Sequence, residues 1–338
     1  NPNFAPAYYG LSFSNMNINK KEKALTFVNK ALKIEPEMVK AANLKSSILN
    51  SVAPYWHTEM INDKKRNSFY YSALKSLIKN TSSVLEIGTG SGLLSIMAAK
   101  LGAKKVDTCE ENNIIAGIAN EIINENNLNN KINIIIKKSN DIKVGVDINK
   151  PANILLSELF SNNFLGEGVL SSLEDAKRRL LTSEAKIIPE FGSVMISLFG
   201  GDRISNRIYA EEYEGIKLKK FNKINSKKYL LHNQDIEVNL MSNAIEAFKF
   251  DFLNNKNFFP EEKKIEIQTI KKGKIFGVIQ WIKIGMFDGL EYENDPRLRD
   301  YGSHWQYVLY LFDNPKDVSD GEKIIVTAKH EKSSIWFF

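Results

Sequence analysis

Two glutamates, Glu158 and Glu167, stand nine positions apart at the two ends of a loop that contains serine, asparagine and phenylalanine. The loop follows the apolar run 153–157, which predicts a central strand, and ligands of open α/β sheets bind at the C-terminal ends of such strands. If the loop folds back, both carboxylates can face one planar cation. A guanidinium fits because its fork of N–H groups matches carboxylates two bonds at a time. The alternative is a pair of exposed loop acids without a ligand.

Three glycines at alternate positions, Gly88, Gly90 and Gly92, follow an apolar run and precede a helical pattern. The run 84–87 and the residues after the last glycine therefore predict strand, tight turn and helix. Glycines are needed there because the backbone must turn sharply and let a ligand lie against it. The third glycine comes one residue too early for a dinucleotide fingerprint, and no lysine follows as in a P-loop. Glu86 stands directly before the turn.

An acid at the end of the next apolar run extends this pattern. Residues 105–110 predict a second strand that ends in Glu110, 22 positions after Gly88. A carboxylate at this place can accept hydrogen bonds from both hydroxyls of a ribose. The glycine spacing resembles motif I of the class I S-adenosylmethionine (SAM) methyltransferases, and this resemblance implies SAM as the cofactor. The alternative is an ordinary α/β crossover turn.

The composition is that of a globular protein. The chain has 338 residues, 43% hydrophobic and 25% charged, so it can hold two or more domains. It has no apolar run of 18 residues and no signal-peptide pattern, which predicts no membrane partner. The single cysteine, Cys109, excludes an internal disulfide, agrees with a reducing cytoplasm and is expected to be a buried structural thiol. The four histidines are scattered, so no metal site is expected.

The net charge of +6 is compatible with an acidic partner such as nucleic acid. Basic residues form no long cluster, however, and lysine, asparagine and isoleucine are abundant throughout the chain. We therefore expect no direct contact with nucleic acid.

Residues 1–50 have a helical pattern that resembles a tetratricopeptide repeat (TPR). Asn19 is expected to cap the second helix, and Pro36 to end it, because proline cannot continue a helix interior. The small residues Ala24 and Ala31 are typical of the second helix of such a repeat. The segment is interpreted either as a docking module for a partner or substrate or as a helical cap on the next domain.

The rest of the chain is expected to form two domains. Residues 51–188 begin with two helices, predicted over 55–67 and 70–79, and continue as the alternating strands and helices of an α/β, Rossmann-like SAM-binding domain. Residues 189–338 contain short β-leaning runs between glycine and asparagine turns, which predicts an antiparallel sandwich or β-barrel. The charged, partly helical stretch 201–240 is interpreted as an inserted arm.

Five short motifs, in this order along the chain, resemble those of the protein arginine methyltransferases and cover the chain from about Pro54 onward. They are Met60-Ile61-Asn62-Asp63-Lys64-Lys65-Arg66, the segment 84–92, Glu110, the loop from Glu158 to Glu167, and Ser303-His304-Trp305, where the family carries Thr-His-Trp. Segments 62–67 and 165–168 look most like the branch that contains the tandem-core monomethylating member and the TPR-bearing symmetric-dimethylating member.

The resemblance implies a cofactor site. Arg66 would pair with the methionine carboxylate of SAM, and Glu110 would hold the ribose hydroxyls. Asp141 would lie near the adenine amino group. The glycine turn would pass beneath the cofactor, which makes Gly88, Gly90, Gly92 and the preceding Glu86 cofactor-binding candidates.

The resemblance also implies a catalytic site. Glu158 and Glu167 would clamp the substrate guanidinium, and Asp63 and His304 would meet as a pair that links the two domains. Met60 and Trp305 are the candidates for further substrate contacts.

The implied function is methyl transfer from SAM to arginine in a protein or peptide. Because only one catalytic core is visible, the resemblance implies a homodimer formed through the arm 201–240. Ser161, Asn162 and Asn163 stand where this branch often carries acids. Two alternatives therefore stay open: a SAM methyltransferase with a non-arginine acceptor, and a TPR-bearing interaction protein with an inactive core.

Overall fold

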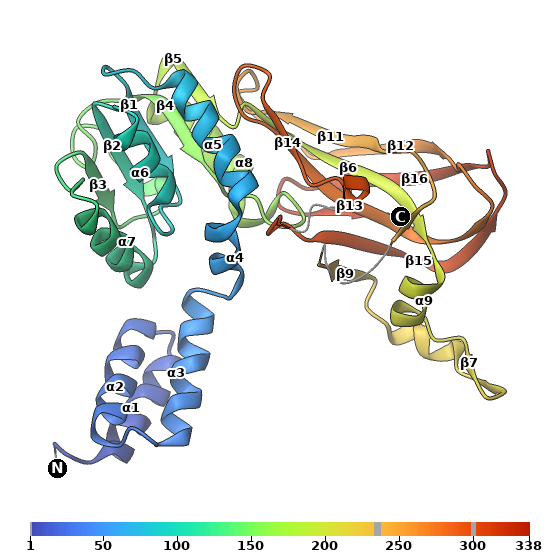
Figure 1. The fold of residues 1–338 in the computed structure, drawn as a ribbon, viewed down its shortest axis with the longest axis horizontal. Helices are drawn as coiled ribbons and strands as arrows, with labels where there is room; N and C mark the ends of the chain where they lie inside the picture. The colour runs from blue at the N-terminus through green and yellow to red at the C-terminus, as the bar shows by residue number, and fades with distance from the viewer. Residues whose placement is uncertain (1, 233–237, 299–301) are drawn as a thin grey trace.

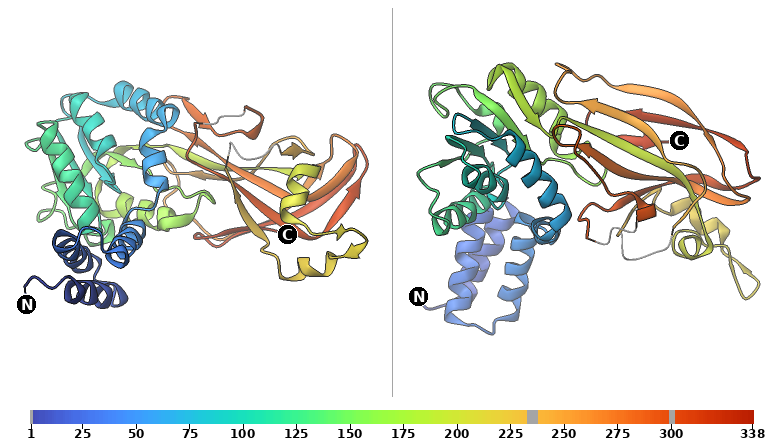
Figure 2. Two further views of the ribbon diagram at one scale, coloured as in Figure 1. Left: turned by 60° about the horizontal axis from the view of Figure 1, so that its bottom comes forward. Right: turned by 45° about the horizontal axis from the view of Figure 1, so that its top comes forward.

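The computed structural model of the chain describes residues 2–232, 238–298 and 302–338. Figure 1 shows three parts in chain order: a small bundle of helices, an α/β part and a β part. The α/β part and the β part are neighbours in all three views, and helices α4 and α5 lead from the bundle to their junction (Figures 1 and 2).

The N-terminal helices pack through small side chains. They are α1 (Ala5–Asn17), α2 (Lys21–Ile34) and α3 (Val39–Val52). Their shared core consists of the buried residues Ala5, Ala24, Val28, Ala31, Ala41 and Ile48. The Ser12 hydroxyl donates to the Ala24 carbonyl at 2.7 Å and so ties α1 to α2. These contacts describe a helical hairpin with a third helix, and membership of the TPR class stays a prediction.

The turn between α1 and α2 differs from the expected cap. Asn19 has a φ of 57°, and its N–H donates to the Met16 carbonyl, so Asn19 closes α1 instead of starting α2. Lys20 precedes α2, and its side chain makes no capping hydrogen bond. The predicted Asn19 cap was therefore wrong, because asparagine also tolerates the left-handed conformation. The end of α2 at Ile34, just before Pro36, agrees with the prediction.

A break after Asn62 separates α4 (Trp56–Asn62) from α5 (Lys64–Leu77). The sequence predicted one helix through Asn67, and this boundary was wrong. Asp63 sets the break, because its carboxylate accepts the N–H of Arg66 at 2.8 Å and caps α5. The capping aspartate was overlooked because helix-compatible residues surround it.

The α/β part contains a five-stranded parallel sheet in the order β3-β2-β1-β4-β5. Its strands are β1 (Ser83–Ile87), β2 (Lys105–Cys109), β3 (Ile132–Ile135), β4 (Ala152–Ser157) and β5 (Leu181–Ile188). The intervening helices are α6 (Leu93–Lys100), α7 (Asn113–Glu125) and α8 (Val169–Arg179), with single turns at η1 (Ser139–Asp141) and η2 (Gly166–Gly168). The strand order reverses between β1 and β4, which is where sheets of this class bind ligands.

The β part is built of antiparallel sheets. One sheet has the path β10-β6-β13-β15-β9, with β11 beside β6 and β14 beside β13, and a second has the order β12-β16-β17. The strands are β6 (Phe191–Gly200), β9 (Lys228–Leu231), β10 (Asn239–Leu240), β11 (Ile245–Asp251), β12 (Glu261–Gln268), β13 (Gly273–Gly285), β14 (Glu291–Glu293), β15 (Tyr307–Val318), β16 (Lys323–His330) and β17 (Ile335–Phe337). The sequence indicated all of them except β9, β10 and β14, which are too short to show an alternating pattern.

A projection leaves the β part at the end remote from the α/β sheet (Figures 1 and 2). It consists of α9 (Asp202–Ile208), β7 (Glu212–Tyr213), β8 (Ile216–Lys217) and the turn η3 (Lys219–Ile224). These elements belong to the predicted arm 201–240, of which residues 233–237 lie outside the described residues.

Cys109 is buried at the end of β2, as predicted for a structural thiol, and burial raises its pKa to about 12. In the part of the chain that the structure describes, no three or more histidine, cysteine, aspartate or glutamate side chains come together as a metal site. No helix in the described ranges has both the length and the apolar character that a membrane crossing needs.

Candidate active site

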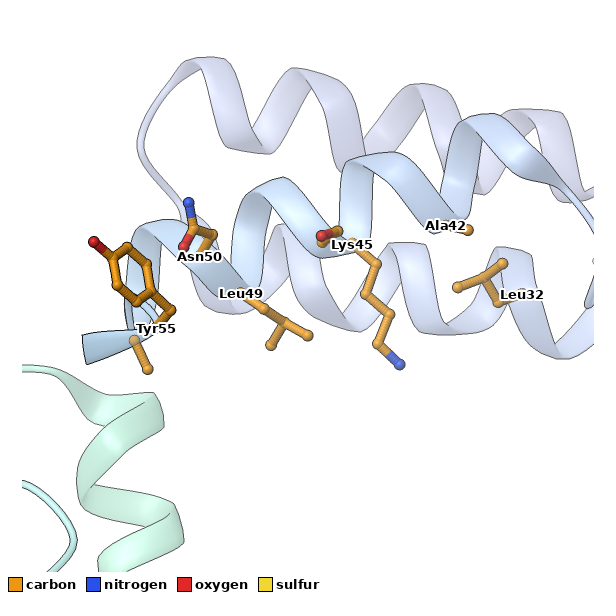
Figure 3. Close-up of a pocket in the computed structure, with 8 residues that line it drawn as sticks. Leu32, Ala42, Lys45, Leu49, Asn50 and Tyr55 are labelled. Carbon is orange, nitrogen blue, oxygen red and sulfur yellow. The ribbon is translucent and has the colours of Figure 1, made fainter. Parts of the chain in front are cut away.

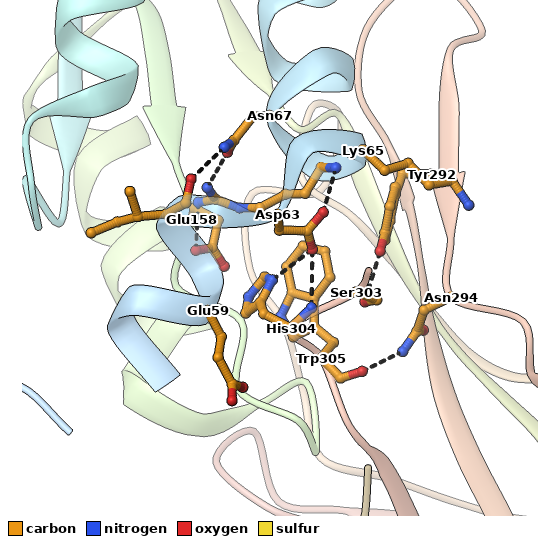
Figure 4. Close-up of polar contacts among 12 residues, drawn as sticks. Glu59, Asp63, Lys65, Asn67, Glu158, Tyr292, Asn294, Ser303, His304 and Trp305 are labelled. Carbon is orange, nitrogen blue, oxygen red and sulfur yellow. Dashed lines mark hydrogen bonds and ion pairs between the residues drawn. The ribbon is translucent and has the colours of Figure 1, made fainter. Parts of the chain in front are cut away.

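Asp63 joins the α/β part to the β part. One carboxylate oxygen accepts the Arg66 N–H, and the other accepts both the backbone N–H and the Nδ1–H of His304, each at 3.0 Å (Figure 4). Both residues are buried. Burial alone would raise the pKa of Asp63, but the hydrogen bonds from the His304 side chain and from the two backbone amides outweigh it and lower that pKa. The structure thus brings together the two residues expected to link the domains.

Arg66 forms an ion pair with Glu158. Its NH2 group donates to Glu158 Oε2 at 2.8 Å, and the two side chains are only 4% and 6% exposed. Its NH1 group donates to the Asn67 side-chain oxygen at 2.7 Å, and Asn67 in turn donates to the Ile61 carbonyl. The Arg66 guanidinium also lies 5.2 Å from the ring centre of Tyr70. Arg66, which was expected to bind the cofactor carboxylate, is therefore paired with Glu158, which was expected to bind the substrate.

The glycine turn lies at the C-terminal end of β1. Gly88, Gly90 and Gly92 have φ values of 86°, 52° and 80°, a conformation that favours glycine. A Cβ at Gly88 would lie 2.8 Å from a methyl carbon of Leu159, whereas a Cβ at Gly90 would meet nothing within 4 Å. The turn therefore has open space beside Gly90 for a ligand.

Glu110 closes the edge of this space. One of its carboxylate oxygens accepts the Gly90 N–H at 3.3 Å, and the other accepts the Asn112 N–H at 3.0 Å. The acid that was expected to hold ribose hydroxyls thus lies at the glycine turn.

Glu86 lies beneath the turn and is buried. Its Oε2 accepts hydrogen bonds from the hydroxyls of Ser95 on α6 and Thr108 on β2. Burial raises the pKa of Glu86 to about 7, although these hydrogen bonds and the charge of Arg66 oppose the rise. The hydrogen bonds that the structure gives Glu86 support the turn from within the protein.

Glu167 completes the group of acids at this edge of the sheet. It occupies η2 with a φ of 58°, and the residue is only partly exposed to solvent, since burial acts on its carboxylate. Partial burial, followed by the charges of Glu158 and Glu110, raises its pKa. Three carboxylates are therefore close enough to influence one another, which suits a site for a cation.

The loop between Glu158 and Glu167 is anchored to the β part. The indole N–H of Trp305 donates to the Phe160 carbonyl at 2.9 Å, and the Gln306 N–H donates to the Asn162 side-chain oxygen at 2.8 Å. Phe164 stacks among the β-part residues Phe250 and Phe252. The β part thereby fixes the position of the loop.

Trp305 lies buried beside the loop that it supports. The residue is only 1% exposed, and its indole N–H donates to the Phe160 carbonyl. A contact between Trp305 and the substrate stays a prediction. Met60 is half-buried on α4. Asp141 is exposed in η1, beside the carbonyls of Ser139 and Ile142 that Arg179 holds.

Four further residues belong to the site. Asn67 and Tyr70 orient Arg66 and the end of β4, since the Tyr70 hydroxyl donates to the Ser157 carbonyl at 3.0 Å. Ser157 and Glu59 each carry a buried oxygen without a hydrogen-bond partner, and that of Glu59 lies 3.7 Å from His232 Nε2 as an ion pair. The helical spacing of Arg66 and Tyr70 was a usable signal, because residues four apart lie on one face. Nothing in the sequence singled out Glu59.

Two unpartnered polar groups, on Arg66 and Ser157, show whether the site fits SAM. The buried Nε–H of Arg66 and the buried hydroxyl of Ser157 have no hydrogen-bond partner in the protein, and leaving such a group unpaired costs about 1–3 kcal/mol. A ligand that brings a carboxylate to this place would satisfy the cation. The methionine end of SAM carries such a carboxylate, while the open turn and Glu110 suit its ribose.

Comparison with known proteins gives the same class. Residues 69–188 match the family model of ribosomal protein L11 methyltransferase (PrmA). An arginine N(omega)-methyltransferase of Streptomyces achromogenes subsp. streptozoticus is 28% identical over 87% of this chain and 81% of its own length. Protein arginine N-methyltransferase 7 of Oryza sativa subsp. indica is 28% identical over 82% of this chain. The chain spans 44% of the length of this rice protein.

A solved structure shows the same fold. The Trypanosoma brucei PRMT1 enzyme–prozyme heterotetrameric complex with AdoHcy matches 81% of this chain and 86% of its own chain, with a TM-score of 0.69 and 22% identity. That likeness concerns the fold of both the α/β part and the sheet part. By its relatives and its fold, the chain is similar to the protein arginine N-methyltransferases, and its α/β part is the domain of a SAM-dependent methyltransferase.

Proposed function

We propose that this protein transfers the methyl group of SAM to a guanidinium nitrogen of arginine. The observation that carries the proposal is the Arg66–Glu158 ion pair, since Glu158 already binds a guanidinium at 2.8 Å in a nearly dry site. Glu167, at the other end of the same loop, lies within reach of the Glu158 charge. The names of the relatives support arginine as the acceptor.

The carboxylates have a defined task in this reaction. Arginine has a pKa above 12, so its nitrogens are poor nucleophiles while the positive charge is delocalised. Glu158 and Glu167 would draw that charge toward the nitrogens they bind and leave the attacking nitrogen richer in electrons. They would also hold it in line with the methyl group, which SAM supplies on a sulfonium when bound.

The attacking nitrogen must lose a proton. Glu167 suits this role because its pKa is raised above the ordinary value, so it is a better base than a free glutamate. The Asp63–His304 pair is the alternative acceptor.

The acceptor is either arginine in a protein or peptide, as the name of the rice relative suggests, or arginine itself, as the name of the Streptomyces relative allows. A radiolabelled methyl-transfer assay with an arginine-rich peptide mixture and with L-arginine decides between them. Label recovered as methylarginine, and lost in Glu158→Gln, is expected. Glu262→Gln, an acid on β12 whose side chain is 61% exposed, is the matched control and should keep full activity.

A non-arginine acceptor is the second candidate, motivated by the neutral residues Ser161, Asn162 and Asn163. The structure gives these residues internal partners: Asn162 binds the Gln306 N–H, and the Ser161 hydroxyl donates to Asn163. These polar side chains thus form hydrogen bonds within the protein that hold the loop in place. A product-mass search over peptides and small molecules would reveal another acceptor, while failure to bind SAM in calorimetry would favour an interaction protein with an inactive core.

A homodimer is proposed through the arm. Its exposed apolar side chains include Tyr213, Ile216, Phe221 and Ile224. Clustered apolar surface of this kind marks an interaction site. Light scattering should show a dimer at micromolar concentration, and Ile224→Glu should yield the monomer. A monomeric wild type would refute this proposal.

The helical bundle is proposed as a docking module. A shallow groove of about 440 Å³ opens on it, lined by residues of α2, α3 and the following turn, among them Leu32, Leu49 and Tyr55 (Figure 3). Deleting residues 2–50 should lower kcat/KM for a protein substrate and leave kcat/KM for L-arginine unchanged. An equal effect on both would indicate a cap on the α/β part.

A further inference from the structure

Arg66 is the only buried lysine or arginine in the described ranges of the chain. One of its nitrogens holds Glu158, a second holds Asn67, and the third, Nε, is buried without a partner. The guanidinium is thus paired with Glu158 and Asn67 through its two terminal nitrogens and is unsatisfied at Nε.

The charge of Glu158 is compensated in this arrangement. Its carboxylate faces Arg66 at 2.8 Å with both side chains out of water, where charges interact much more strongly than in solution. A guanidinium that approached Glu158 in this state would meet an acid already neutralised and a second cation beside it. The site as it stands therefore disfavours binding of its own substrate.

The charge of Arg66 lies near the glycine turn as well, since it acts on buried Glu86 beneath that turn. SAM carries one carboxylate, and a buried cation with an unpartnered N–H is the natural group to receive it. When Arg66 is shared with a second carboxylate, less of its charge remains to compensate Glu158.

We propose that Arg66 couples the two ligands of the site: by engaging the carboxylate of the cofactor, it releases the negative charge of Glu158 for the substrate guanidinium. This inference rests on the proposed function. Coupling between two sites is reciprocal, so Glu158 must also weaken the binding of the cofactor carboxylate. Arg66 acts here as a positioning residue between the ligands.

The reciprocal effect can be measured without any acceptor. The probes are S-adenosylhomocysteine (SAH) and S-adenosyl-3-thiopropylamine, which is SAH without its carboxylate. In Glu158→Gln, Arg66 loses its competing charge, so we expect calorimetry to show SAH binding about tenfold more tightly, within the range usual for coupled sites. The affinity for the decarboxylated probe should not change.

Two further variants give opposite or absent effects. Asn67→Asp adds a carboxylate at the NH1 group of Arg66 and should weaken SAH binding about tenfold, again without an effect on the decarboxylated probe. Glu167→Gln removes an acid of the same loop for which the structure shows no hydrogen bond or ion pair to Arg66, and it should leave both affinities unchanged. Asn67→Asp keeps the test available if Glu158→Gln fails to fold.

Equal shifts for both probes, or unchanged SAH affinity in Glu158→Gln and Asn67→Asp, would overturn the coupling. The methyl-transfer assay on the wild type reports the proposed function separately. A wild type that methylates arginine, with carboxylate-independent shifts, would refute the coupling alone. The expected shifts in a protein that methylates no arginine would refute the function and leave the coupling intact.

Discussion

Glu167 has a raised pKa because it is partly buried and faces the charges of Glu158 and Glu110. A clamp on a guanidinium needs this carboxylate ionised, so activity should fall as the pH drops through a value above the ordinary glutamate pKa of 4.5. Glu167→Gln should lower kcat about 10²–10³-fold, the usual loss for one group that stabilises developing charge. The pH profile of kcat/KM for both proteins provides the measurement. An acid limb at or below 4.5 in the wild type would contradict the assignment.

Glu86 makes the stability of the protein depend on pH, because burial raises its pKa in the folded state. The folded protein keeps its proton up to about pH 7, whereas the unfolded chain loses it near 4.5. Between these values only the folded state binds the proton, so the free energy of unfolding falls as the pH rises, by on the order of 3 kcal/mol. Urea unfolding of the wild type and Glu86→Gln at pH 5 and pH 8 tests this. The stability of the wild type relative to the variant should be lower at pH 8, and a constant difference would refute the shift.

Some residues of the candidate site could be predicted from the sequence. Family motifs supplied Asp63, His304 and the two loop glutamates, because their types and order are distinctive. The Arg66–Glu158 contact could not be foreseen, since it joins residues 92 positions apart whose meeting depends on the packing of α5 against β4. The burial of Trp305 could not be foreseen for a related reason: a motif gives a residue type and leaves its burial undetermined.

At the scale of elements, the loop after β4 is held by the insertion of Phe164 into the β part. Gly192 on β6 makes room for it, because a Cβ there would lie 2.1 Å from the end of the Phe164 ring. Gly192→Ala should displace the loop and its two glutamates. We expect kcat/KM for the acceptor to fall about 10²-fold, the size of effect that follows a displacement of about 1 Å, with little change in SAH affinity.

Gly117→Ala is the matched control for this substitution. Gly117 lies in α7, a Cβ there meets nothing within 4 Å, and alanine favours a helix over glycine by about 1 kcal/mol. This variant should be as active as the wild type and somewhat more stable. Equal activity in both alanine variants would show that the Phe164 contact does not position the loop.

Helices and strands with a clear pattern of apolar residues could be predicted, whereas breaks and turns that depend on a single contact could not. The parallel strands and the long antiparallel strands follow from continuous or alternating apolar runs. The α4–α5 break and the Asn19 turn depend on one hydrogen bond or one left-handed residue, and each residue type permits two outcomes. Strands β10 and β14 exist because longer neighbours pair with them, which a local pattern does not contain.

At the scale of the whole molecule, the site exists only where the two domains meet. Asp63 and Arg66 come from the helices before the α/β sheet, Glu158 from its edge, and His304 from the β part. The sequence indicated two domains and their classes. The contact surface between them could not be predicted, because it depends on tertiary packing. The neutral residue Asn162 illustrates this, because its use as a bond to Gln306 appears only once both domains are in place.

The Asp63–His304 contact makes a final prediction about this joint. Asp63→Asn removes an ionised acceptor and leaves two buried His304 donors without it, which should cost about 1–3 kcal/mol of unfolding free energy at pH 7. Because the pKa of Asp63 is lowered in the folded state, its contribution is complete above the ordinary value of 3.8 and is lost as the pH falls through the lower folded value. The difference between wild type and variant should therefore be full at pH 7 and smaller at pH 3. Asp313→Asn, whose side chain is 90% exposed, should show no difference at either pH. If the Asp63→Asn deficit in urea unfolding were as large at pH 3 as at pH 7, the charge of Asp63 would not be what joins the domains.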